Sequence, residues 1–287
     1  CDECAEEYQN PLDRRYYSQT NSCDLCGIEM ALYDSRGELI TKESKGIIDQ
    51  IAALWKDGKT VAIKGIGGYL LTCDASNRQA IDELRKRKHR PAKPFALMYP
   101  NLYRLEQDVN LRDIEKESLK SSVAPIVLLD VQANHSSICL EQTAPGLEQI
   151  GVMLPYTPLY DLLLDQFNQP IIATSGNISH SPIVFTDTKA FSDLEDISDA
   201  ILINNREIVI PQDDSVIKYT DKHQQKMIYR RSRGLAPGYI NKDLKMSHET
   251  ILATGAMLKN TFTYLNHQNI YISQYLGNLD HFDTEKN

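Results

Sequence analysis

The stretch Arg85-Lys86-Arg87-Lys88-His89-Arg90-Pro91-Ala92-Lys93-Pro94 joins a predicted helix to a predicted strand and places six cations within nine residues. The whole chain, in contrast, has a formal net charge of -8 at pH 7. A basic run in an acidic protein indicates an anionic ligand, although a solvated helix end gives the same pattern. The prolines prevent one continuous helix through the run, so its cations can converge on one point.

Predicted strands and helices alternate on both sides of this stretch. Short apolar runs predict strands, and apolar residues at helical spacing predict the helices between them. The predicted strands are 60–64, 94–98, 125–129, 150–154, 170–174, 201–203, 208–210, 215–219 and 227–230. A helix capped by Asp74 or Ser76 leads into the basic stretch. The alternation predicts an α/β domain with a twisted mixed sheet. A further small sheet is expected from the runs 251–255, 261–265 and 270–273.

A polar cluster, Thr174-Ser175-Gly176-Asn177, follows the predicted strand 170–174. Open α/β sheets place their ligands at strand ends, where these side chains would lie. Phosphoryl and nucleotidyl transfer depend mainly on positioning and charge neutralisation. Arginine supplies a planar fork for phosphate and lysine a mobile point charge. The basic stretch and the polar cluster together therefore predict a polyphosphate pocket.

Four of the six cysteines form two Cys-x2-Cys pairs, Cys1 with Cys4 and Cys23 with Cys26, separated by eighteen residues. This spacing is typical of a four-cysteine zinc site, whose role is structural because no coordination position stays open. Two disulfides are the alternative, but they require an oxidising compartment. We favour zinc, and a module of about 36 residues would need the metal in order to fold.

Composition restricts the classes of partner. The chain has no apolar run near the roughly 18 residues that a membrane helix needs, so we expect a soluble, cytosolic protein without a membrane partner. Its negative charge argues against general nucleic-acid binding, which depends on clustered Lys and Arg. A zinc-ribbon RNA-binding module is the non-enzymatic alternative, and only the basic clusters 85–93 and 230–233 favour it.

Two short motifs, Lys88-x-Arg90 and the later Ser175-x-Asn177, resemble motifs of threonylcarbamoyl-AMP synthases. These enzymes have the YrdC-like fold, and their ATP site uses a Lys-x-Arg and a Ser-x-Asn. Longer strings are similar to the carbamoyltransferase HypF family. These strings are Cys1-Asp-Glu-Cys4-Ala-Glu-Glu-Tyr8, Lys64-Gly-Ile-Gly-Gly68, Arg90-Pro-Ala-Lys-Pro-Phe-Ala96, Gly151-Val-Met-Leu-Pro-Tyr-Thr-Pro158, Asp213-Asp-Ser-Val216, Arg230-Arg-Ser-Arg-Gly234 and Gly255-Ala-Met-Leu-Lys-Asn-Thr-Phe262. The chain departs from the family pattern at Ile28, where proline is usual, and at His180, where many relatives have glycine.

The HypF resemblance implies a domain order and a reaction. Residues 1–36 would be the second zinc module, 37–240 the YrdC-like domain, and 241–287 the start of an ASKHA-type transferase domain. The YrdC-like domain would join a carbamoyl group, supplied by carbamoyl phosphate or carbamate, to the AMP of ATP and release pyrophosphate. The transferase domain would then pass the carbamoyl group to the C-terminal cysteine of HypE during maturation of nickel–iron hydrogenase.

The resemblance also implies roles for particular residues. Lys88 and Arg90 would hold the polyphosphate with help from Lys93, while Ser175 and Asn177 would position ATP and the carbamoyl group. The remaining candidates for phosphate binding are Lys64, Thr174, Arg230 and Arg233. Magnesium is expected to arrive with ATP, with Asp214 as a candidate ligand. A threonylcarbamoyl-AMP synthase is the alternative enzyme, but it gives no reason for the zinc module.

Overall fold

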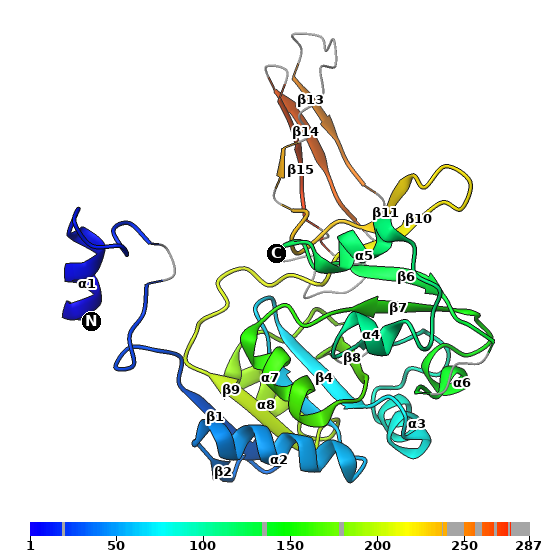
Figure 1. Ribbon diagram of the computed structural model, residues 1–287, viewed down its shortest axis with the longest axis horizontal. Helices are drawn as coiled ribbons and strands as arrows, with labels where there is room; N and C mark the ends of the chain where they lie inside the picture. The colour runs from blue at the N-terminus through cyan, green and yellow to red at the C-terminus, as the bar shows by residue number, and fades with distance from the viewer. Residues whose placement is uncertain are drawn as a thin grey trace.

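The computed structural model describes residues 1–18, 21–133, 137–177, 181–236, 238–239, 250–255, 260–266, 269–274 and 276. Figure 1 shows a small N-terminal module standing apart at the left of a large α/β domain, and a slender antiparallel sheet that projects from the top of that domain. None of the helices in the described part of the chain is long and apolar enough to cross a membrane. His180 lies outside the described residues.

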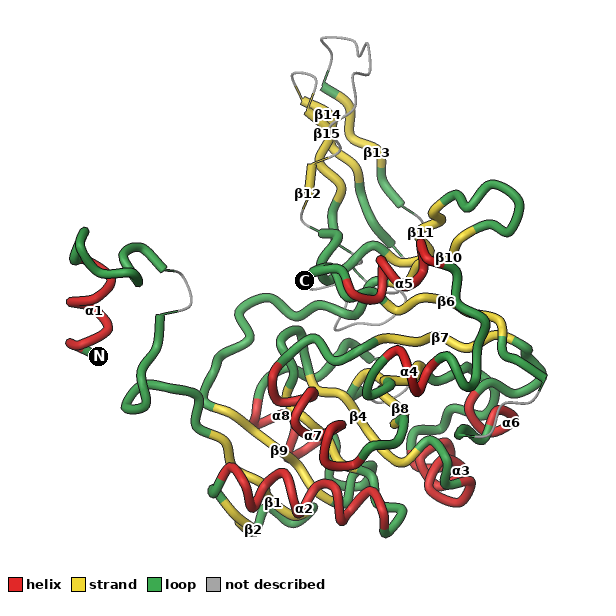
Figure 2. The backbone as a smooth tube through the Cα atoms, in the orientation of Figure 1, coloured by secondary structure: helices red, strands yellow, loops and turns green. Residues whose placement is uncertain are grey.

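Helices and strands alternate through the large domain (Figure 2). The helices are α1 (Asp2–Gln9), α2 (Ser44–Lys56), α3 (Arg78–Arg87), α4 (Leu102–Leu105), α5 (Asp113–Lys120), α6 (Leu140–Thr143), α7 (Pro158–Phe167) and α8 (Asp187–Asp193). The strands of the large sheet are β1 (Met30–Asp34), β2 (Leu39–Thr41), β3 (Val61–Lys64), β4 (Tyr69–Asp74), β5 (Ala96–Met98), β6 (Ile126–Asp130), β7 (Gln149–Met153), β8 (Ile171–Ser175), β9 (Ala200–Asn204), β10 (Val216–Tyr219) and β11 (Lys226–Arg230). The small sheet contains β12 (Gly238–Tyr239), β13 (Ile251–Ala253), β14 (Thr263–Asn266) and β15 (Asn269–Ile272).

The large sheet is mixed, as predicted. Its order in the described part of the chain is β11-β10-β6-β7-β5-β8-β4-β3-β9-β1-β2. The pairs β10–β6, β5–β7 and β3–β9 are parallel, whereas the other neighbours run antiparallel. Strand β1 belongs to this sheet through its pairing with β9, although it lies within the segment 1–36 expected for the metal module.

The pairing of β5 with β8 positions the site. These strands are antiparallel, with Leu97 opposite Ile172 and Met98 opposite Ile171. Because antiparallel neighbours run in opposite directions, the residues that precede β5 lie beside the residues that end β8. The basic stretch therefore meets the polar cluster 174–177 at one edge of the pleated surface, although about 80 residues separate them in the sequence.

Apolar side chains cover both faces of the large sheet. Ile47, Ile51 and Trp55 of α2 pack with Leu163 and Phe167 of α7 against one face. Helices α3, α5 and α8 contribute buried side chains to the cluster on the other face. Their apolar residues recur at helical spacing, so each helix presents one apolar stripe to the sheet. This arrangement is the layered α/β architecture that the alternating pattern predicts.

Two local predictions are wrong. The run 208–210 is a loop rather than a strand, and Val209 has 79% of its surface exposed. Apolar character alone cannot form a strand without a partner for the backbone, and this segment pairs with none of the sheet strands. The N-cap of α3 is Asn77, whose side-chain oxygen accepts from Ala80 N at 3.1 Å. Asp74 instead accepts from Ser76 N at 2.8 Å in the preceding turn.

Trp55 offers a test of the packing between α2 and the sheet. Its side chain is fully buried, and its Nε1 donates to Thr72 Oγ1 at 3.1 Å. Its ring packs edge-on against that of Phe167, with the ring centroids 5.2 Å apart. We expect Trp55→Phe to lower the free energy of unfolding by about 1–3 kcal/mol, through lost volume and a lost hydrogen bond. Urea unfolding followed by circular dichroism measures the change. Leu162→Ala on the exposed side of α7 should change stability by less than about 0.5 kcal/mol. Equal effects of the two substitutions would contradict this account.

Candidate active site and metal centre

A cleft of about 190 Å³ opens on the sheet face that also carries α2 and α7. Its apolar floor comes from five strands, through Ala96 (β5), Leu128 (β6), Gly151 (β7), Ala173 (β8) and Val216 (β10). Charged and hydroxyl groups surround this floor. They are Arg90, Lys93, Arg230, Asp213, Asp214, Thr174 and Ser175. The cleft therefore brings the basic stretch and the polar cluster together in one site.

Lys88 lies behind the cleft rather than in its lining. The side chain is only 2% exposed, and its Nζ donates to Ser175 O at 2.7 Å, Asn177 O at 2.6 Å and Asn177 Oδ1 at 2.8 Å. Three acceptors match the three donors of an ammonium group. Burial, followed by the charges of Arg90 and Lys93, lowers the pKa of Lys88 to about 7. This lysine therefore holds the end of β8 in place, and its charge state responds to the charges around it.

Hydrogen bonds and close packing hold the polar cluster at the end of β8 in a compact turn. Ser175 Oγ donates to Asn177 Oδ1 at 2.8 Å, and Asn177 Nδ2 donates to Ser181 O at 2.6 Å. Gly176 lies against Tyr69, and a Cβ at position 176 would come within 2.8 Å of that residue's backbone oxygen. Only glycine fits between Ser175 and Asn177 here. The Ser-Gly-Asn turn is thus set by close packing before any ligand binds.

Arg85 supports the other side of the cleft. Its buried guanidinium donates to the carbonyl oxygens of Arg90 at 2.8 Å and Lys93 at 3.1 Å, and also to those of Gln142 at 2.6 Å and Thr143 at 3.0 Å. The same group stacks over the Phe95 ring, 4.4 Å from its centroid. Four carbonyl oxygens from two segments therefore converge on one planar cation. Arg85 fixes the backbone from which Arg90 and Lys93 extend.

Arg90 extends into the cleft across the same aromatic ring. Its guanidinium lies 4.9 Å from the Phe95 centroid, donates to Thr174 Oγ1 at 3.2 Å and Lys93 O at 3.1 Å, and also bonds Pro94 O. Burial, followed by the charges of Arg85 and Arg230, lowers the pKa of Arg90 to about 10. An arginine surrounded by other cations favours an anion in the adjacent space.

Arg230 and Arg233 have different environments. Arg230 Nε donates to Asp214 O at 2.6 Å, and its Nη1 lies 3.9 Å from Asp213 Oδ2, so this arginine borders the cleft. Arg233 is buried and its Nε donates to Asp214 Oδ1 at 2.9 Å. Its Nη2 lies 2.8 Å from the same oxygen, and its guanidinium stacks over the Tyr156 ring, 4.0 Å from the centroid. The lining of the cleft includes Arg230 and does not include Arg233.

Lys64 also lies away from the cleft lining. Its Nζ contacts Asp187 Oδ1 at 2.6 Å and donates to Asn204 O at 3.0 Å, which ties the end of β3 to α8 and β9. The structure therefore brings Lys88, Arg90, Lys93, Thr174, Ser175, Asn177 and Arg230 together but separates Lys64 and Arg233 from them. Sequence reasoning missed Arg85 and Phe95. The signal was present, because Arg85 is the first residue of the basic stretch and Phe95 directly follows it, but spacing alone cannot distinguish a buried cation from an exposed one.

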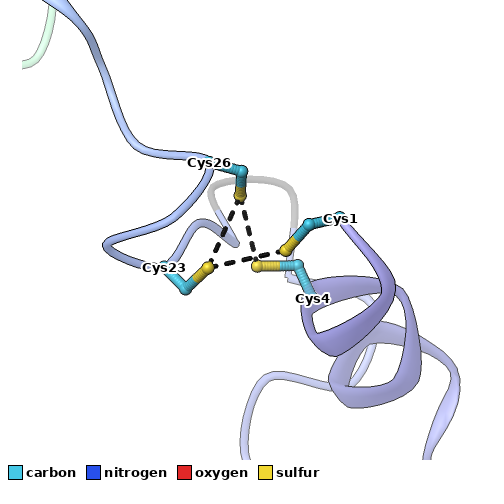
Figure 3. Close-up of side chains that lie close together, drawn as sticks. All are labelled: Cys1, Cys4, Cys23 and Cys26. Atoms are coloured by element: carbon cyan, nitrogen blue, oxygen red, sulfur yellow. Dashed lines mark hydrogen bonds between the residues drawn. The ribbon is translucent and has the colours of Figure 1, made fainter.

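The four predicted metal ligands meet in the N-terminal module (Figure 3). Sγ of Cys1 lies 3.5 Å from that of Cys23, Sγ of Cys4 lies 3.5 Å from that of Cys26, and the Cys23 and Cys26 sulfurs are 3.8 Å apart. A tetrahedral zinc ion with bonds of about 2.3 Å requires sulfur–sulfur distances of about 3.8 Å. All four cysteines are free of disulfides. The donor set and spacing therefore fit a closed, structural metal centre.

The module contacts the large domain through the loop that follows β9. Arg206 Nη2 donates to Cys26 O at 2.9 Å, and Glu29 N donates to Asn205 Oδ1 at 3.1 Å. Within the module, Asn21 Nδ2 donates to Cys4 O at 2.9 Å. Figure 1 shows the module apart from β6, β7, β8 and β10, which supply residues to the cleft lining, so its cysteines do not take part in cleft chemistry.

Three family models match consecutive parts of the chain. The Sua5/YciO/YrdC model, described as "Telomere recombination", matches residues 53–232. The HypF finger model matches residues 1–33, and the HypF Kae1-like domain model matches residues 246–287.

Among curated relatives, HypF proteins are more similar to the chain than a threonylcarbamoyl-AMP synthase is. Carbamoyltransferase HypF of Synechocystis sp. is 39% identical over 259 residues, which are 90% of this chain and 33% of the relative. That of Rhodobacter capsulatus is 38% identical over 98% of this chain and 36% of the relative. Threonylcarbamoyl-AMP synthase of Photobacterium profundum is 27% identical over 54% of this chain. The chain spans about a third of the length of the HypF relatives.

Solved structures agree with the sequence matches. Full-length HypF, crystallised in a phosphate- and nucleotide-bound form, superposes with a TM-score of 0.88 at 36% identity, over 100% of this chain and 36% of that protein. Sua5 of P. abyssi, complexed with L-threonine, has a TM-score of 0.57 at 23% identity and shares the fold alone. The family resemblance expected from the motifs is confirmed. The chain belongs to the Sua5/YciO/YrdC family, and it carries that domain in the HypF arrangement, between a HypF finger and a Kae1-like segment.

Proposed function

We propose that the cleft binds ATP and catalyses formation of a carbamoyl adenylate. In this reaction an oxygen of carbamate attacks the α-phosphorus of ATP, and the bond from that phosphorus to the pyrophosphate oxygen breaks. Carbamoyl-AMP and pyrophosphate leave as products. The observation that carries the proposal is the convergence of Arg90, Lys93 and Arg230 with the hydroxyls of Thr174 and Ser175 around one cleft.

Each side chain has a proposed role that follows from its environment. Arg90 and Arg230 hold the polyphosphate, and exposed Lys93 offsets the charge that develops on the leaving pyrophosphate. Ser175 and Thr174 direct the α-phosphate and the carbamate. Lys88 and Asn177 position Ser175 through the buried network described above. Lys64 and Arg233 support the surrounding backbone, because their charges are already neutralised by Asp187 and Asp214.

Other components of the reaction are proposals from the family. Carbamoyl phosphate would supply the carbamate, and the C-terminal cysteine of HypE would be the final acceptor. The threonylcarbamoyl-AMP synthase reaction differs in the group that attacks ATP. The basic stretch does not support the RNA-binding alternative, since Arg85, Lys88 and Arg90 point inward to protein carbonyl groups. We propose zinc as the metal of the N-terminal module, with a structural role.

Lys93→Ala tests whether the nucleotide lies in the cleft. Loss of one charge-assisted contact should weaken ATP binding by about 10- to 100-fold, measured by calorimetry on the zinc-loaded chain with magnesium. Lys86→Ala is the matched control, because Lys86 belongs to the same basic stretch but has an 82% exposed side chain near Glu83. We expect its affinity to stay within about twofold of the original chain. Equal losses in both variants would indicate general charge attraction instead of a site.

Carbamoyl adenylate formation itself is tested by isotope exchange between pyrophosphate and ATP. The exchange should depend on carbamoyl phosphate or carbamate and should be unaffected by threonine. Exchange that requires threonine would establish the synthase alternative instead.

Nucleotide binding should be coupled to proton uptake by Lys88. With a pKa of about 7 in the free chain, Lys88 is mostly neutral at pH 8, and bound phosphates favour its ammonium form. We expect uptake of up to about one proton per magnesium–ATP at pH 8 and little uptake at pH 6, where Lys88 already carries its proton. Calorimetry at each pH in buffers of different ionisation enthalpy measures the uptake. The same uptake at both pH values would exclude Lys88 as its source.

Removal of zinc should unfold the N-terminal module and spare the large domain. We expect one zinc per chain by colorimetric release, falling to less than about 0.2 in Cys4→Ser. Cys139→Ser should keep full zinc content, because Cys139 lies outside the cluster and bonds Ser76 O. Chelation should expose the module to protease without lowering the thermal midpoint of the large domain by more than a few degrees. Full zinc content in Cys4→Ser would contradict the assignment.

A further inference from the structure

The two adjacent carboxylates at the cleft are not equivalent. Asp214 accepts a hydrogen bond from Nε of the buried Arg233 guanidinium and forms an ion pair with its Nη2, and its side chain is 11% exposed. Asp213 has a 24% exposed side chain, and among the described residues its carboxylate has only the longer ion-pair contact of 3.9 Å to Arg230. The charge of Asp214 is therefore neutralised from behind the cleft. That of Asp213 faces the space where the phosphates would bind.

The backbone holds Asp213 in this position from both sides. Its carbonyl oxygen accepts from Arg233 N at 3.1 Å, and the preceding residue, Gln212, donates from its N to Gly67 O at 2.8 Å. Gly67 is required at this contact, because a Cβ there would come within 2.3 Å of Gln212 O. The backbone that carries this carboxylate is thus fixed at the rim of the cleft, which limits how far the carboxylate can move away from an incoming anion.

A fixed carboxylate is unfavourable in a site for a bare polyphosphate. It repels the phosphate charges and competes with them for the cations that surround it. The chain nevertheless places Asp213 among Arg90, Lys93 and Arg230 in the lining of the cleft. A divalent cation reverses the effect, since Mg²⁺ is bound through one or two carboxylates together with phosphate oxygens. The same carboxylate then attracts the ligand that it would otherwise repel.

We infer that Asp213, rather than Asp214, makes the cleft selective for the metal-bound form of the nucleotide, by binding the divalent cation that bridges to the phosphates. This inference rests on the proposed function and adds to it a specificity-determining residue. Asp214 is less suited to this role, because its Oδ1 contacts both Nε and Nη2 of Arg233 and its charge is already neutralised.

Asp213→Asn tests the inference on the full, zinc-loaded chain. The dissociation constant for ATP is measured by calorimetry in magnesium and again in excess EDTA. The original chain should bind the magnesium complex at least about tenfold more tightly than metal-free ATP. The variant should bind metal-free ATP about tenfold more tightly than the original chain does, and its preference for magnesium should fall below about threefold. Asp221→Asn, a change at an 88% exposed side chain in the β10–β11 turn, should leave the preference unaltered.

The outcomes separate this inference from the proposed function. Tight ATP binding with the same magnesium preference in Asp213→Asn and the original chain overturns the role of Asp213 and leaves the nucleotide site intact. Failure of the folded original chain to bind ATP in either condition overturns the proposed function itself. Asp213→Ser provides a second variant, with circular dichroism to show that it folds, and it must lose the preference as Asp213→Asn does.

Discussion

A buried ammonium group joins the two halves of the cleft. Lys88 directly follows α3 in the basic stretch. Its Nζ donates to two backbone carbonyls and one side-chain oxygen at the end of β8. These three bonds connect Lys88 to the Ser-Gly-Asn turn. Arg85 has the corresponding role on the other side, where four carbonyl oxygens surround its guanidinium. Arg90 and Lys93, for which we propose phosphate contacts, extend from the backbone that Arg85 holds.

The basic stretch therefore contains buried residues that hold the backbone and other residues that face the cleft. Arg85 and Lys88 are buried and bond protein carbonyls, whereas Arg90 and Lys93 line the cleft. This division resolves the contrast between a basic run and an acidic chain, because much of the positive charge is used internally. It also explains the low pKa of Lys88, since an ammonium that lies in a buried site beside other cations loses much of its preference for the proton. Fixed positions for the remaining cations lower the cost of assembling the site when an anion binds.

Carboxylates complete the electrostatic arrangement. Asp187 neutralises Lys64 and Asp214 neutralises Arg233, so both cations serve the backbone around the cleft. Asp213 remains at the rim with one long contact to Arg230. The metal module, in contrast, meets the large domain through a few hydrogen bonds at the loop after β9, and its four sulfurs lie close to one another within the module. Its contribution is thus structural, while the chemistry that we propose belongs to the cleft.

The sequence by itself determined the alternation of strands and helices and the four-cysteine cluster, because periodicity and ligand spacing are local properties. It gave the motifs Lys88-x-Arg90 and Ser175-x-Asn177 as well, but their pairing in one site was an expectation from the family resemblance. It could not assign a role to each cation. Lys64 and Arg233 look in the sequence like Arg90 and Arg230. Tertiary partners distinguish them, among them Asp187 for Lys64 and Asp214 for Arg233. The failed strand at 208–210 has the same cause, since a strand requires a partner that lies elsewhere. Burial and long-range pairing are decided when β5 meets β8 and the sheet closes around the cleft, so they belong to the tertiary structure alone.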